Sequence, residues 1–261
     1  NAYTYAPSAI TSFLAATATK VAIYVMLRFL FSVFQPGFLA EVPTLDLVLY
    51  PFAILAMFAA SYTAILQRDL KRMLAYSSIG QVGYMLLGIA LLSESGLMAT
   101  MIHLFNHGIT KAALFMGVGV YVLNGGGSFY HNLRGRGKTM PWTSAAMVVA
   151  GLSLIGVPGT AGFLSKWLLV EATLEQGLWP IALLIVASSL LAVIYVWKLI
   201  ETLYLAQPAE GLQDQNVPLM MMIPLWVMAL ACIYFGFDTD ITLSAARSAA
   251  EGLLAGSAGM R

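Results

Sequence analysis

Three side chains that can gain and lose protons recur every fourth residue within one apolar stretch. His103, His107 and Lys111 lie in the segment 97–123, which is long enough to cross a bilayer as a helix. At 3.6 residues per turn, this spacing places them within an arc of about 80° and raises them about 12 Å along one face. A charge at mid-membrane costs about 2.5 kcal/mol or more, so the row predicts a function. The simplest one is a path for protons.

Each imidazole can accept a proton on one nitrogen and donate one from the other, and the free group titrates near pH 6.5. A lone membrane histidine more often bonds two helices together, but two on one face beside a lysine favour a relay. A haem or metal site needs more ligands, and no Asp, Glu or Cys accompanies them. We therefore expect no metal and no cofactor. The single cysteine, Cys232, excludes an internal disulfide and is typical of apolar packing.

Two further lysines, Lys20 and Lys166, interrupt other apolar segments. Lys20 lies near the middle of its segment, whereas Arg28 occupies the end where a snorkelling side chain is expected. Thr17 and Tyr24, at i−3 and i+4, are expected to give Lys20 polar neighbours. Because burial disfavours the charged form of lysine, its protonation depends on its surroundings, as a proton-loading site requires. Lys198, near the inner end of its segment, is expected to snorkel.

Helix-breaking residues come directly before Lys166, in the run Gly156-Val-Pro-Gly-Thr-Ala-Gly-Phe-Leu-Ser-Lys166. Pro158, Gly159 and Gly162 cannot sustain an unbroken helix in lipid. A break frees backbone carbonyls and amides, which transporters use to line a polar cavity at mid-membrane. A kink that serves only packing is the alternative, but the coincidence of break and charge favours function.

A second polar group is expected where Ser77 and Gln81 enter the bilayer. They stand beside Gly80 and Gly83, small residues that allow close helix packing and hydrogen bonds between helices. We therefore predict that these two side chains support the site.

The composition is that of an integral membrane protein, with 60% hydrophobic and 10% charged residues against about 25% charged in soluble domains. No basic run suits nucleic acid. We predict an all-α transmembrane domain over 1–261, with a tail from 238 to 261 that forms a short interfacial helix. The seven apolar segments of bilayer length are 9–34, 48–66, 73–92, 97–123, 142–170, 179–205 and 217–236.

Basic residues predict the orientation. They gather in the loops around 68–72 and 134–138, while the loops between hold only acidic charges. Under the positive-inside rule the basic loops face the cytoplasm, with residue 1 inside and the C-terminus outside. The loop at 206–217 is also expected on the cytoplasmic side, although its only charged residues are the acidic Glu210 and Asp214. The first residues read as a loop without an initiator Met, so we expect a C-terminal fragment of a longer protein.

Four motifs together resemble antiporter-like proton-translocating subunits, and they follow the order of that family. They are Asn1-Ala-Tyr-Thr-Tyr-Ala-Pro-Ser8 with the run 15–28, Asp69-Leu-Lys-Arg-Met-Leu-Ala-Tyr-Ser-Ser78, Ile102-His-Leu-Phe-Asn-His-Gly-Ile-Thr-Lys-Ala-Ala-Leu-Phe115, and 156–166. The family includes membrane-arm subunits of respiratory complex I, Mrp-type multisubunit Na+/H+ antiporters and membrane-bound hydrogenases. Within this family, the first motif looks most like the D-type component of the Mrp antiporters.

The resemblance implies the second half of a fourteen-helix fold with two inverted repeats. Segment 1–34 would hold the last helix of the first repeat, 48–205 the second repeat, and 217–261 the final helix and tail. Lys20 would connect two half-channels, His103, His107 and Lys111 would form the central relay, and Lys166 would be the terminal site. Some relatives have glutamate at that last position. The family's acidic residue and lysine of the first repeat would lie upstream of this chain.

The expected function is that of a non-enzymatic subunit of a cation/proton antiporter in the cytoplasmic membrane, exchanging protons for Na+ beside other membrane subunits. The alternative is proton pumping in a complex I-like quinone oxidoreductase or a membrane-bound hydrogenase. A receptor-like or structural helical bundle is a third possibility, but it does not require lysine on three mid-membrane segments.

Overall fold

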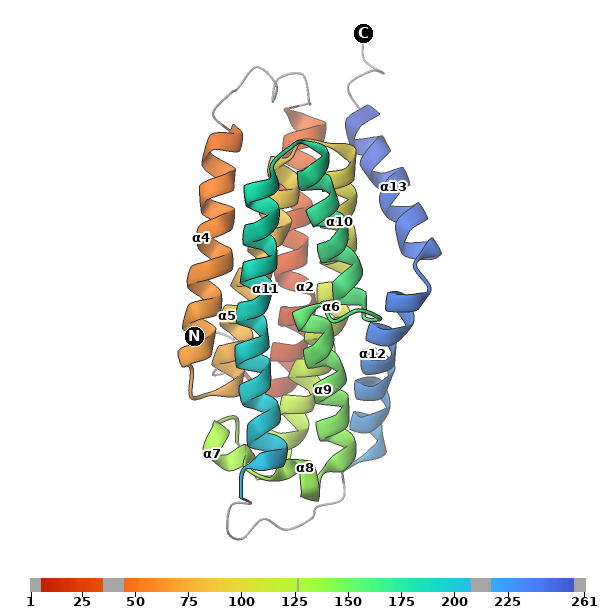
Figure 1. The fold of residues 1–261 in the computed structure, drawn as a ribbon. Coiled ribbons are helices and arrows are strands. Elements are labelled where there is room, and N and C mark those ends of the chain that lie inside the picture. Colours follow the sequence, from red (N-terminus) through yellow and green to blue (C-terminus); the bar gives the residue numbers. More distant parts are fainter. Residues whose placement is uncertain (1–5, 35–44, 126, 208–216, 256–261) are drawn as a thin grey trace.

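The computed structural model describes residues 6–34, 45–125, 127–207 and 217–255, and it is helical throughout, as predicted. Figure 1 shows the helices running roughly along one common direction. In chain order the elements are α2 (Ser8–Arg28), the π-helix η1 (Phe29–Val33), α4 (Leu45–Leu66), α5 (Leu70–Ala90), α6 (Glu94–Leu123), α7 (Tyr130–Leu133), α8 (Arg136–Thr139), α9 (Pro141–Ile155), α10 (Ala161–Glu175), α11 (Trp179–Ile200), the π-helix η2 (Glu201–Leu205), α12 (Leu219–Phe237) and α13 (Asp240–Ala255).

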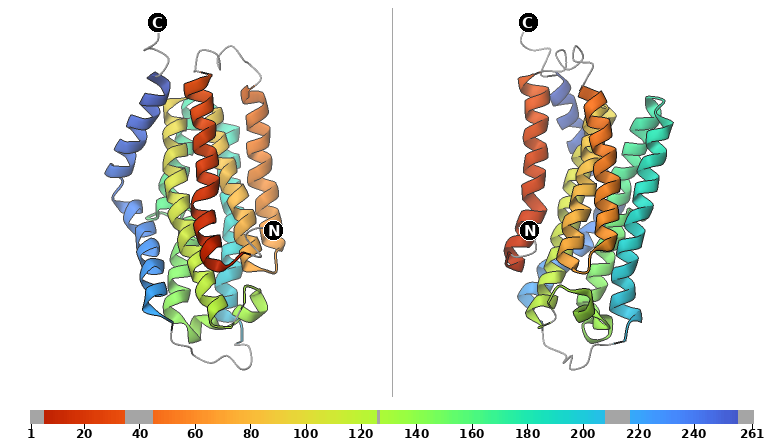
Figure 2. Two further views of the ribbon diagram at one scale, coloured as in Figure 1. Left: turned by 180° about the vertical axis from the view of Figure 1, so that it is seen from behind. Right: turned by 90° about the vertical axis from the view of Figure 1, so that its left-hand side faces the viewer.

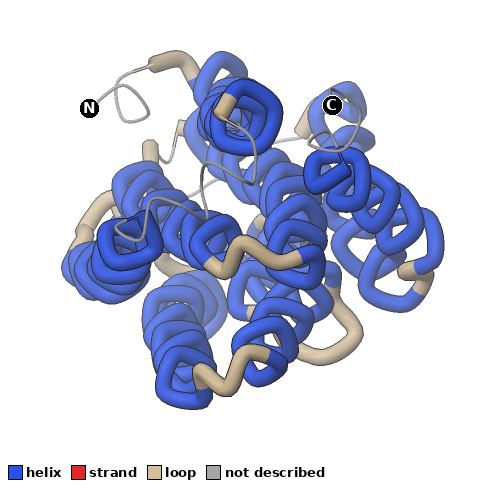
Figure 3. Tube along the Cα trace, turned by 90° about the horizontal axis from the view of Figure 1, so that it is seen from above, coloured by secondary structure: helices blue, strands red, loops and turns tan. Residues whose placement is uncertain are grey.

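Helix α6 is the centre of the bundle, and Figure 3 looks down the long direction of the surrounding helices. It contacts α2, α5, α9, α10, α12 and α13. Glycines permit this close packing: a Cβ added at Gly108 would lie 3.4 Å from Ala16 O of α2, and one at Gly117 would clash with Met147 of α9. The side chains of α6 therefore face many helices at once, which suits a helix that bears the predicted relay.

The predicted break near Pro158-Gly159 is confirmed. Helix α9 ends at Ile155 and α10 begins at Ala161, with Gly156 at φ +89° and Gly159 at φ +84°. Both glycines adopt the left-handed region, which side chains with a Cβ rarely enter. The two half-helices meet closely, because a Cβ added at Gly162 would clash with Ser153 O.

Among the described residues, five helices are long and apolar enough to cross a membrane: 8–33, 47–66, 70–90, 179–205 and 219–237. The other two predicted segments differ for physical reasons. Helix α6 spans 30 residues but bears the polar row, and the segment 142–170 is divided into α9 and α10, with 15 residues each.

The tail does not form the separate interfacial helix that we predicted. Helix α13 instead packs along α6 and against η1, which continues α2, and Ala246 and Ala250 are buried. Figure 2 shows it running lengthwise beside the bundle. Its inner face consists of small residues that fit against a neighbouring helix, which explains the difference. The C-terminal end of α12 lies against the break in 156–160, since a Cβ added at Gly236 would clash with the backbone of Gly159 and Thr160.

The two basic loops lie together at one end of the bundle. Leu70 N donates to Ser128 O at 2.7 Å, and Tyr130 N donates to Arg68 O at 3.1 Å. Asp69 accepts from Arg72 N at 2.9 Å and from Ser128 Oγ at 2.5 Å, which caps α5 and holds the second loop. This shared end agrees with the predicted orientation, although Glu210 and Asp214 lie outside the described residues.

Candidate functional site

All five residues of the predicted relay are buried, and three helices provide them. Their exposed fractions are 5% for Lys20 on α2, 4%, 3% and 0% for His103, His107 and Lys111 on α6, and 6% for Lys166 on α10. Within the described ranges, no three His, Cys, Asp or Glu side chains come together as a metal site. The relay residues themselves are three lysines and two histidines.

The two histidines stack on one face of α6. Their ring centroids lie 6.0 Å apart, with 9° between the planes. His103 Nδ1 contacts Ser165 Oγ at 2.8 Å, whereas neither ring nitrogen of His107 has a hydrogen-bond partner among the described residues. Buried nitrogens without a protein partner cost free energy and so call for an explanation, and proton exchange is one.

Lys111 reaches from α6 to α5. Its Nζ donates to Leu74 O at 2.7 Å and to Ser77 Oγ at 2.6 Å. Ser77 and Ser78 also donate to Leu74 O, so this carbonyl is a shared acceptor. The predicted supporting residue Ser77 thus contacts the relay directly. Gln81, the other predicted supporting residue, instead hydrogen-bonds to Tyr195 of α11.

Lys166 occupies the break. Its Nζ donates to Leu154 O at 3.1 Å and to Ile155 O at 2.7 Å. These carbonyls end α9, where partial negative charge accumulates and favours a cation. Asn106 of α6 fastens the other half-helix by donating to Ala161 O at 2.7 Å. The break thus supplies carbonyl acceptors to the ammonium.

Lys20 turns toward α6, because its Cε lies 3.9 Å from the position of a Cβ added at Gly108. Its ammonium donates to Ala15 O on its own helix. The polar neighbours expected for it do not form that contact: Thr17 donates to Phe13 O, and Tyr24 is 56% exposed. The helix faces explain this, since the backbone carbonyl is closer to the buried side of α2 than either side chain.

Similarity to known proteins decides the family. A family model described as "NADH:quinone oxidoreductase/Mrp antiporter, TM" matches residues 1–192. The chain belongs to this family. It is 36% identical to NADH-quinone oxidoreductase subunit N of Desulforudis audaxviator, covering 94% of this chain and 51% of that protein. It is 35% identical to F(420)H(2) dehydrogenase subunit L of Methanosarcina mazei, covering 85% and 34%.

A solved structure of the Mrp complex from Dietzia sp. has the same fold, with a TM-score of 0.88 and 24% identity, covering 97% of this chain and 55% of that one. As a member of this family, the chain is a multi-pass integral membrane protein. It spans about half the length of the first relative.

The sequence did not lead us to predict contacts at or near the relay for three polar residues. Ser165 contacts His103, Tyr84 contacts both His103 and Lys166, and Thr110 contacts Ser153 of α9 at 3.0 Å. Ser165 stands directly before Lys166, and that position could have revealed it. Thr110 stands directly before Lys111 in the same way. Tyr84 gave no such signal, because it is far in the chain from both His103 and Lys166. Lys198, which is expected to snorkel, donates to Ile65 O and Gln67 O and caps the end of α4.

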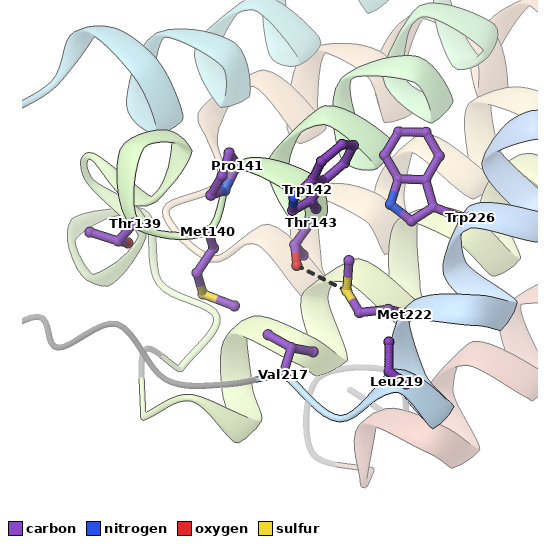
Figure 4. Close-up of a pocket in the computed structure, with 9 residues that line it drawn as sticks. All are labelled: Thr139, Met140, Pro141, Trp142, Thr143, Val217, Leu219, Met222 and Trp226. Atoms are coloured by element: carbon purple, nitrogen blue, oxygen red, sulfur yellow. Dashed lines mark hydrogen bonds between the residues drawn. The ribbon is translucent and has the colours of Figure 1, made fainter.

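Two cavities differ in whether they reach the predicted relay. One of about 660 Å³ lies between α2, α6 and α13, where Lys20, Tyr24 and Arg28 line it. Another, of about 500 Å³, lies at the end with the basic loops and contains none of the five relay residues. Figure 4 shows its Trp142 and Trp226, and the bond from Thr143 Oγ1 to Met222 Sδ. Of these two cavities, only the first is therefore related to the proposed chemistry.

Proposed function

We propose that this chain forms the proton-relay half of a membrane subunit in a redox-driven respiratory complex related to NADH-quinone oxidoreductase. The observation that supports it is the buried set Lys20, His103, His107, Lys111 and Lys166, centred on α6. A structural bundle would not gather so many titratable groups away from water, because each costs free energy there.

The relay residues have complementary tasks. Lys111 and Lys166 hold a proton as ammonium, and serine and carbonyl oxygens accept hydrogen bonds from it. His103 and His107 exchange protons between their two nitrogens, and the Ser165 hydroxyl can accept and donate next to His103.

Positive charges on neighbouring relay groups repel one another, since no buried carboxylate near them among the described residues offsets them. A proton that arrives at one lysine therefore favours release from the next. In this proposal a neighbouring component of the complex drives proton transfer by changing the charge beside one end of the relay. Redox chemistry belongs to such partners, so this subunit is not itself an enzyme.

The opening motif favoured Na+/H+ antiport, whereas the two curated relatives favour a redox-driven complex. Each is more than one third identical to this chain and is named as a subunit of an oxidoreductase or dehydrogenase. Antiport by an Mrp-type complex remains the second candidate, supported by the fold it shares with the Dietzia complex. We place either complex in the cytoplasmic membrane, beside other membrane subunits.

Everted vesicles that contain the intact complex separate the candidates. NADH, reduced coenzyme F420 and H2 are supplied in turn, and acidification of the lumen is followed with a pH-sensitive dye. We expect one donor to cause acidification that is lost in Lys111→Met. Dissipation of an imposed pH gradient by Na+ without any donor, lost in the same variant, would support antiport instead.

A further inference from the structure

Tyr84 of α5 lies where the two parts of the relay meet. Lys166 Nζ is 5.0 Å from the centroid of the Tyr84 ring, and the His103 ring centroid is 5.6 Å from the same centroid. Tyr84 is 2% exposed. It therefore contacts a lysine of α10 and a histidine of α6.

The orientation of this ring is fixed from the far side. Tyr84 OH donates to Ser188 Oγ at 3.0 Å and lies 3.3 Å from Ser189 Oγ, both on α11. Ser188 in turn donates to Met57 O of α4 at 3.3 Å. Gly83, the neighbour of Tyr84, contacts α4 so closely that a Cβ there would lie 2.7 Å from Ala53 O. Three helices thus determine where the ring stands.

An aromatic face attracts a cation through its quadrupole, and the attraction is strongest where water is excluded. Neutral lysine gains nothing comparable. The Tyr84 ring therefore distinguishes the two protonation states of Lys166, and the Leu154 and Ile155 carbonyls act in the same direction. Simple packing would also explain a buried tyrosine, but it does not require the ammonium to stand over the ring.

We propose that Tyr84 is a positioning residue of the relay, a role that rests on the proposed function. Its ring stabilises the ammonium form of Lys166 and holds the ammonium against the same tyrosine that the His103 ring contacts. The site thereby sets the pH range over which Lys166 can pass its proton on.

Other groups around Lys166 also affect its protonation, and the test must keep them unchanged. From α6 these are His103 and His107, and from α2 the ammonium of Lys20, whose charge acts on the same histidines. Helix α9 contributes the carbonyls named above and the Ser153 hydroxyl. Helix α11 contributes the hydroxyls that face Tyr84 and the buried Tyr195, and α12 contributes Cys232, which faces Thr110.

The experiment measures the pH profile of proton transport by the intact complex in everted vesicles. Tyr84→Phe keeps the ring, and Tyr84→Leu removes it. We expect the alkaline limb to move to lower pH by about one unit in Tyr84→Leu and to stay within about 0.3 unit in Tyr84→Phe. Tyr121→Leu is the matched control, because Tyr121 is another fully buried tyrosine of the bundle whose OH contacts Ser144 near the basic loops.

A second series keeps the shape of the side chain, so that assembly does not decide the result. Phenylalanine at position 84 is replaced by analogues with increasing numbers of ring fluorines, which remove negative charge from the ring face. We expect the alkaline limb to move stepwise to lower pH with each fluorine. A profile independent of fluorination would overturn the role of Tyr84, whatever the outcome with leucine.

Lys166→Met in the same assay separates this inference from the proposed function. Persisting transport in Lys166→Met would overturn the relay itself. Transport lost in Lys166→Met, together with an unmoved profile in the fluorinated series, would overturn only the inference about Tyr84.

Discussion

The ammonium of Lys111 and the hydroxyl of Ser77 lie 2.6 Å apart, on α6 and α5. A hydrogen bond to a charged group is worth about 1.5–3 kcal/mol, twice the value between neutral groups. This contact joins the central helix to the segment that starts at the basic loops.

Replacing Ser77 by Ala should slow proton transport about tenfold, because the ammonium of Lys111 loses one of its two acceptors. Donor-driven acidification of everted vesicles measures this rate. Ser78→Ala is the control, since Ser78 donates to the same Leu74 carbonyl but does not contact Lys111. Equal rates in the two variants would contradict a specific role for Ser77.

Lys111→Met should reduce transport at least about 100-fold, the lower range for a positioned proton-transfer group, while the complex still assembles. Methionine keeps much of the length and removes the charge from a fully buried site. Lys138→Met changes an exposed lysine at the basic end and should leave the rate unchanged. Normal transport in a correctly assembled Lys111→Met complex would remove Lys111 from the relay.

His107→Phe should abolish relay through this position without loss of stability. Both ring nitrogens are buried without a partner among the described residues, so phenylalanine, which keeps a ring there, removes no hydrogen bond to the described protein. Thermal unfolding of the purified complex in detergent measures stability, and vesicle acidification measures transport. A clear fall in the melting temperature would contradict this, because it would mean that the His107 imidazole makes a stabilising hydrogen bond that phenylalanine cannot make.

Gly162→Ala should destabilise the protein by about 2 kcal/mol or more, because the added Cβ clashes with Ser153 O at the helix break. Gly252 of α13 is the matched control: a Cβ there meets nothing within 4 Å, and alanine in an exposed helix gains about 0.5–1 kcal/mol. The same thermal assay compares them. An unchanged melting temperature in Gly162→Ala would show that the half-helices can separate without cost.

Local patterns in the sequence were enough to predict much of the fold. Apolar length placed the ends of most helices within a few residues, and the glycine and proline run located the break. The tail was predicted less well. Its small residues gave little hydropathy signal, and only the packing of α13 against α6 and η1 shows why it lies there.

The sequence by itself determined which groups could bear protons and that α6 presents three of them on one face, because helical periodicity depends only on spacing. Only the tertiary structure decided what those groups contact. Lys20 faces Gly108 rather than Thr17 and Tyr24, and Lys166 stands over Tyr84, some 80 positions away in the chain. Contacts between helices depend on how the helices pack around α6, and no local pattern encodes that.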